Sequence, residues 1–276
     1  MNECVAAAPG TALGDYARIE LETAITRLGW RGGRLHAGVH QARKALRRAR
    51  ATLALGANRL GPGAVMIDRE LRQINGGLSS LRDAQALVET LDRHIAAGHD
   101  AAMTRLLRRV RRVAAGRRVA AARDAQALDP GLAERRAMLH VLCAALAALP
   151  WASVPPSHLR DRLADSRARM DREKVRATTS GRDQDWHRWR RRARRLSQQR
   201  RALHSTGLEA KVPLDHAAFD KPTTERLGIA QDLSLLLEHC GRRSVFSKPD
   251  RHALRRYAEP ELARLRHHIA HAAEHS

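Results

Sequence analysis

VHQARKALRRAR, from Val39 to Arg50, is the stretch that decides the fold of this chain. Placed on an α-helix that turns about 100° per residue, its cationic side chains gather within about 80° of His40. The opposite side of that helix carries Ala42, Leu46 and Ala49. A cationic stripe facing an apolar stripe at this spacing predicts an amphipathic helix with one basic face. The cations of this face are Arg43, Lys44, Arg47, Arg48 and Arg50.

The same pattern returns 147 residues later in WHRWRRRARRLS, from Trp186 to Ser197. Both stretches read His-x-x-Arg-[Lys/Arg]-x-x-Arg-Arg, and we call them the first and second motif. Neither basic face contains an acid, although like charges at helical spacing repel each other. The same unfavourable repulsion among cations occurs in both motifs, which indicates that both basic faces bind an anion. The second basic face consists of His187, Arg190, Arg191, Arg194 and Arg195.

Two further matches at nearly the same offset indicate an internal duplication. LSSLRDAQALVE, residues 78–89, aligns with LGIAQDLSLLLE, residues 227–238, and pairs Asp83 with Asp232. A weaker match aligns two basic clusters. These are Arg105, Arg108 and Arg109, and then His252, Arg255 and Arg256.

The spacing of apolar residues is helical almost throughout, and no segment alternates as a strand does. Pro and Gly breaks divide the chain into about nine helices. We therefore predict an all-α fold of two pseudo-twofold-related helical bundles. Its parts are an N-terminal tail at 1–14, a first helical repeat at 15–150 and a second at 151–276, together one domain. PWASVPP, residues 150–156, is the predicted connection between the repeats.

The charge of the chain predicts an anionic partner. Lys and Arg number 51 against 29 Asp and Glu, which gives a formal net charge of +22. Such a charge is complementary to a nucleic acid, an acidic membrane surface or a phosphate polymer. Arginine predominates, and its planar guanidinium suits bidentate contact with phosphate oxygens. Aromatic residues make up only 3% of the chain, which disfavours binding of single strands by base stacking.

The cysteines, the N-terminus and the apolar segments indicate in which compartment the protein is expected. Cys4, Cys143 and Cys240 are far apart and form no CxxC pair, so neither a disulfide framework nor a zinc site is expected. The N-terminus lacks a basic segment before an apolar one, and no apolar run is long enough to span a membrane. The prediction is a soluble cytoplasmic protein that needs no membrane and shows no obligate protein partner.

Individual polar residues within this pattern have predicted roles. His40 and His187 begin the two basic faces, where neighbouring arginines disfavour protonation until an anion arrives. Asp83 and Asp232 lie in otherwise apolar stretches and are expected to pair with motif arginines and orient them. There is no P-loop, no cluster of carboxylates and no nucleophile beside a base. We expect no catalytic residue, metal or cofactor.

The paired motifs, together with RDAQALVETL at 82–91, resemble the CHAD family, the conserved histidine α-helical domain. The resemblance runs from about Asp15 to His271. It implies two bundles around a basic central cavity that binds inorganic polyphosphate, with association with polyphosphate granules as a further implication. This chain departs from the family where the second motif continues as Leu196-Ser197-Gln198 and lacks one expected cation. It also lacks the E-x-E-x-K signature of the hydrolase to which many relatives are fused.

Three functions remain open at this stage. The first is non-catalytic binding of inorganic polyphosphate, with other polyanions as further ligands. The second is a nucleic-acid or nucleoid-associated protein, and the third is a phosphatase or phosphotransferase that uses His40 or His187. The candidate binding residues are His40, Arg43, Lys44, Arg47, Arg48, Arg50, Arg108, Arg109, His187, Arg190, Arg191, Arg194, Arg195, His252, Arg255 and Arg256.

Overall fold

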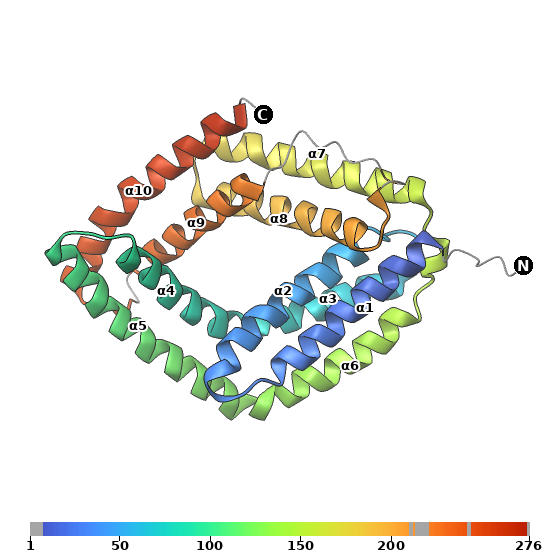
Figure 1. Ribbon diagram of the computed structural model, residues 1–276, viewed down its shortest axis with the longest axis horizontal. Coiled ribbons are helices and arrows are strands. Elements are labelled where there is room, and N and C mark those ends of the chain that lie inside the picture. Colours follow the sequence, from blue (N-terminus) through green and yellow to red (C-terminus); the bar gives the residue numbers. More distant parts are fainter. Residues whose placement is uncertain (1–7, 210–211, 213–220, 242–243, 275–276) are drawn as a thin grey trace, which may run out of the picture. The chain divides into compact units, whose positions relative to one another are not determined.

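The computed structural model describes residues 8–209, 212, 221–241 and 244–274, and in these ranges the chain is all-α (Figure 1). The predicted fold class is therefore confirmed. The α-helices are α1 (Pro9–Leu28), α2 (Leu35–Leu53), α3 (Gly61–Gly77), α4 (Ser79–Ala96), α5 (Ala101–Leu128), α6 (Ala133–Ala147), α7 (Pro156–Ser180), α8 (Asp183–Ser205), α9 (Lys221–Glu238) and α10 (Lys248–Glu274). Three short 3-10 helices connect them: η1 (Gly32–Arg34), η2 (Pro130–Leu132) and η3 (Trp151–Ser153).

Ten α-helices in the described residues replace the predicted nine or so. The additional break separates α3 from α4 at Leu78, directly after Gly76 and Gly77. Glycine weakens a helix because it loses the most backbone freedom on ordering. The Pro and Gly breaks used in the prediction did not include this pair.

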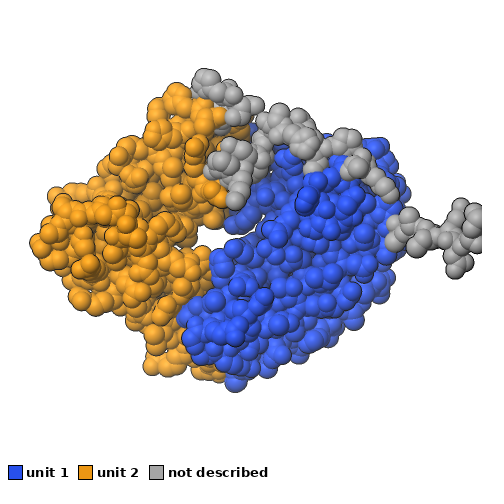
Figure 2. Space-filling view, viewed as in Figure 1, with its two compact units in different colours: residues 1–79, 128–173, 191–216 blue, residues 80–127, 174–190, 217–276 orange. Residues whose placement is uncertain are grey.

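The chain forms two compact units (Figure 2). Unit 1 comprises residues 1–79, 128–173 and 191–216, and unit 2 comprises residues 80–127, 174–190 and 217–276. Helices α7 and α8 each contribute to both units. Each unit contains segments from both halves of the sequence, so the units do not correspond to the predicted repeats at 15–150 and 151–276. The division into repeats, the internal duplication and the central cavity stay predictions.

The core of unit 1 forms around α1, which packs along α2 and α6. Leu13, Leu21 and Leu46 are completely buried there. Gly38 permits the close approach of α1 and α2, because a Cβ atom at this position would lie 2.3 Å from the carbonyl oxygen of Arg27. The apolar stripe of α2 therefore faces α1.

The predicted connection at 150–156 is an ordered part of unit 1. Trp151 in η3 is 5% exposed, and its Nε1–H donates to the carbonyl oxygen of Leu146 over 2.9 Å. Added Cβ atoms at Gly10 and Gly14 of α1 would collide with Trp151. Two glycines one turn apart thus form the surface on which the tryptophan lies.

In unit 2, α9 packs against α10. Leu91 of α4 and Leu254 of α10 are fully buried, and so is nearly all of Trp189 at the N-terminal half of α8. The Trp189 ring lies 5.3 Å from the ring of Trp186. These large apolar side chains hold the first half of α8 against the unit and fix the direction of its polar side.

No helix in the described ranges combines the length and apolar character that crossing a membrane would require.

Candidate anion-binding site

All six candidate residues of the first motif lie on α2, in unit 1. Lys44 is exposed, whereas the other five are half-buried. The Arg43 guanidinium donates to the carbonyl oxygen of Asn75 in the last turn of α3 and, over 3.4 Å, to the hydroxyl of Ser79. A cation at this position also offsets the negative end of the α3 dipole.

Two motif arginines are paired with carboxylates from neighbouring helices. Nη1 of Arg48 lies 3.1 Å from both carboxylate oxygens of Glu20 on α1, which is only 7% exposed. Arg50 makes a two-bond contact with Asp68 on α3, at 2.8 and 3.3 Å. Burial alone would raise the pKa of Asp68, but the Arg50 hydrogen bond and nearby arginine charges hold it below its usual value.

The sequence analysis missed both of these carboxylates. A signal for Glu20 was available, because it shares the buried stripe of α1 with Ala17, Leu21 and Ala24. An acid among core positions is expected to have a cationic partner. Asp68 gave no such signal, since only the packing of α3 beside α2 brings it to Arg50.

The second motif lies on α8 and is divided between the two units. His187 and Arg190 belong to unit 2, whereas Arg191, Arg194 and Arg195 belong to unit 1. Arg191 is exposed and the other four are half-buried. One basic helix therefore supplies cations to two separate clusters.

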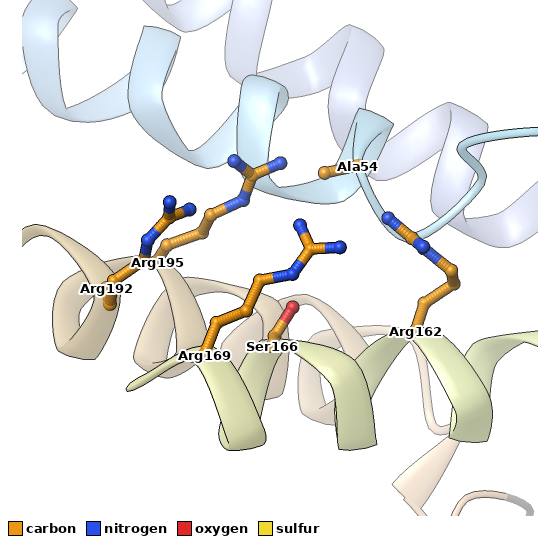
Figure 3. Close-up of a pocket in the computed structure, with 6 residues that line it drawn as sticks. All are labelled: Ala54, Arg162, Ser166, Arg169, Arg192 and Arg195. Carbon is orange, nitrogen blue, oxygen red and sulfur yellow. The ribbon is translucent and has the colours of Figure 1, made fainter. Parts of the chain in front are cut away.

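The cluster in unit 1 is a recess lined by four arginines (Figure 3), which we call the arginine pocket. Arg162 and Arg169 project from α7, and Arg192 and Arg195 project from α8. Ser166 and Ala54 complete the lining. Of these six residues, only Arg195 was predicted. Arg162 and Arg169 were missed because α7 also carries several acids, which is typical of a solvated face.

Positive charge is in excess around the arginine pocket. Burial lowers the pKa of Arg195, as do the charges of Arg50, Arg192 and Arg169, while Asp68 acts in the opposite direction. Arg162, Arg192 and Arg195 are half-buried, whereas Arg169 is exposed. Bringing half-buried guanidinium groups together without a carboxylate for each is unfavourable. An anion in the pocket would remove this cost.

The cluster in unit 2 gathers around Arg190. Burial lowers the pKa of Arg190, the Arg82 charge lowers it further, and the charge of Asp232 opposes the shift. Asp232 also accepts a hydrogen bond of 3.1 Å from Arg93 on α4. The hydrogen bond of Asp232 goes to an arginine outside the motif, and the predicted pairing of Asp232 with a motif arginine stays a prediction.

His187 and Asp83 have neighbours on α9 and just after it. His187 Nδ1 lies 2.6 Å from the side-chain oxygen of Gln231, which fits donation from the ring N–H to the amide oxygen. Asp83 is exposed and close to His239, the residue that follows α9. Burial lowers the pKa of His239, and the Asp83 carboxylate partly offsets this.

The third predicted cluster lies on α5 and α10 of unit 2. Arg109 is paired with the buried carboxylate of Asp250, with Nε 3.1 Å from Oδ1. Arg255 donates to the carbonyl oxygen of Cys240 over 2.8 Å. These contacts tie both arginines to their own unit. The remaining members are also exposed: Arg105, Arg108, His252 and Arg256.

The chemistry of both clusters is that of hydrogen-bond donation to an anion. Guanidinium groups donate and do not accept, and they stay protonated at any physiological pH. Within the described ranges, no group of three or more His, Cys, Asp or Glu side chains is placed to hold a metal ion.

These observations define an all-α protein in which the helices that carry the two motifs supply clustered arginines. The CHAD domain family model matches residues 22–241, and the chain belongs to the CHAD family. It is also similar in structure to the crystal structure of the CHAD domain from the plant Ricinus communis, with a TM-score of 0.63 and 19% identity over 96% of this chain and 92% of that chain. No curated protein has significant sequence similarity to the chain.

Proposed function

We propose that this protein binds inorganic polyphosphate through the arginine faces of α2 and α8, without catalysis. The observation that carries the proposal is the pair of half-buried arginines on α8. Arg82 lies near Arg190, and three further arginines lie near Arg195. Carboxylates neutralise them only in part. A polyanion would supply the missing charge at both places. Membership of the CHAD family supports the same choice.

A phosphate polymer fits these faces for two reasons. Arginines spaced three or four residues apart repeat along one side of a helix about every 5–6 Å. A flexible chain with a charge on every unit can therefore meet several of them in succession. Guanidinium also pairs with phosphate oxygens through two parallel hydrogen bonds. We further propose a cytoplasmic setting and association with polyphosphate granules.

A competition experiment tests the proposal. Purified protein should bind long-chain polyphosphate more tightly than duplex DNA in the same buffer and salt. The variant R190Q/R195Q should lose polyphosphate affinity by about tenfold or more, since one charged hydrogen bond contributes roughly 1.5–3 kcal/mol. Tighter binding of DNA than of polyphosphate would overturn the proposal.

The matched control is R59Q/R112Q, which removes one exposed arginine from each unit and the same total charge. We expect its polyphosphate affinity to stay within about twofold of the unmodified protein, because exposed charges contribute little individually. An equal loss in both variants would mean that net charge, and not the α8 clusters, determines binding.

A further inference from the structure

We propose that the arginine pocket of unit 1 is a discrete site for a compact phosphate anion, of the size of orthophosphate or pyrophosphate. Such an anion could be a free molecule or the end group of a longer chain. The inference rests on the proposed function in one respect, which is the choice of a phosphate compound as the ligand. The pocket itself is assembled mostly from residues outside the two motifs.

The geometry of the pocket comes from two helices that turn matching faces toward one recess (Figure 3). Arg162, Ser166 and Arg169 are spaced four and three residues apart on α7, which places them on one side of that helix. Arg192 and Arg195 are three residues apart on α8 and share a side in the same way. Four arginines and one serine thus line one recess.

The balance of charge around the pocket is strongly positive. Arg162 donates to Asp165 over 3.0 Å, and Arg169 lies 4.0 Å from the same carboxylate. Asp165 is about half exposed, so water weakens its charge. Asp68, the other nearby carboxylate, accepts hydrogen bonds on both oxygens from Arg50 and Arg72 and offsets the charge of Arg195 only in part. The two carboxylates stand against six guanidinium groups, those of Arg50, Arg72, Arg162, Arg169, Arg192 and Arg195.

The lining also favours a compact ligand. Ala54, just after the C-terminal end of α2, lines the recess with an apolar side chain, and Ser166 offers a neutral hydroxyl among the arginines. A phosphate group has several oxygens that can each accept hydrogen bonds from more than one guanidinium. One tetrahedral anion can therefore satisfy donors that converge from two helices. The exposed side of α2 lacks this convergence.

Titration calorimetry with pyrophosphate tests the inference on the intact chain. The variant R162Q/R169Q should lose pyrophosphate affinity by about tenfold or more. The control R160Q/R172Q removes the same charge from exposed positions of the same helix and should stay within about twofold. Thermal unfolding of each variant verifies the fold.

A second variant protects the test against misfolding. R162K/R169K keeps the charge and loses the planar two-bond contact, so its pyrophosphate affinity should lie between those of the unmodified protein and R162Q/R169Q. Pyrophosphate affinity that is the same in the unmodified protein and in all three variants would overturn the inference, and so would the absence of measurable pyrophosphate binding.

Competition separates the two sources of the anion. If pyrophosphate displaces long-chain polyphosphate from the pocket, the pocket holds a chain end, and if both bind together, it holds a free anion. Either result supports the site. Pyrophosphate binding that depends on the pocket, in a protein that does not bind long chains, would contradict the proposed function and leave the inference standing. If the protein binds long chains but the pocket variants bind pyrophosphate as well as the unmodified protein does, the inference would be contradicted and the proposed function would stand.

Discussion

At the residue scale, His187 shows how a hydrogen bond can fix the state of a binding histidine. Because Nδ1 faces the oxygen of Gln231, the ring proton of the neutral form lies on Nδ1. The other nitrogen, Nε2, then carries a lone pair and cannot donate to a phosphate oxygen. It becomes a donor only after the ring gains a second proton. Recognition of an anion by Nε2 of His187 therefore requires protonation.

This arrangement predicts that polyphosphate binding takes up protons. Affinity should rise a few-fold as the pH falls from about 8 to about 6, around the ordinary histidine pKa of roughly 6.5. Calorimetry in buffers of different ionisation enthalpy measures the uptake directly. The variant H40Q/H187Q should bind a few-fold more weakly and take up fewer protons. Unchanged uptake in that variant would assign the protons to other groups, and transfer of phosphate onto either ring would favour an enzyme.

The residue scale also marks the limit of prediction from this sequence. Helical spacing identified the basic face of α2, because it depends only on local geometry. The partners of that face do not follow from spacing. Glu20 and Asp68 reach Arg48 and Arg50 from other helices, at separations of 28 and 18 residues. Which carboxylate meets which arginine is determined by side-chain packing.

At the scale of the element, glycine decides how closely α1 and α2 approach. Gly38→Ala should destabilise the protein by about 1–3 kcal/mol, because the new methyl group meets the backbone oxygen of Arg27, which cannot move aside as a side chain could. Chemical denaturation measures the change in the free energy of unfolding.

Gly116→Ala is the matched control, since Gly116 lies inside α5 with nothing near its added Cβ. That change should stabilise the protein by up to about 1 kcal/mol through helix propensity. A stabilised Gly38→Ala variant would show that α1 and α2 do not pack as closely as described.

The elements themselves were largely predictable. The Pro and Gly breaks at Pro9, Gly98, Pro130 and Gly181 all lie at helix boundaries, because these residues act on the local backbone. The helical class followed for the same reason. The role of α7 could not be predicted, since its acids and arginines alternate along the sequence. Only the neighbouring α8 selects which of its arginines line the pocket.

At the scale of the whole molecule, the net charge of +22 has two opposite consequences for salt. Salt should stabilise the unliganded protein, because it screens the repulsion among its arginines. Salt should weaken polyphosphate binding, with the logarithm of affinity falling linearly with the logarithm of salt concentration as counterions are released. Thermal unfolding and titration across one salt series measure both effects. An affinity that does not respond to salt would contradict an electrostatic mode of binding.

The way the chain passes between its two units has a consequence for genetic experiments. The chain crosses from one unit to the other after residues 79, 127, 173, 190 and 216. No contiguous stretch of coding sequence therefore encodes either unit, and a stop codon before residue 217 removes pieces of both. Loss of binding in a truncated protein would report a broken fold and would not locate the ligand. Mapping of function in this protein therefore depends on single-codon changes that leave the chain at full length.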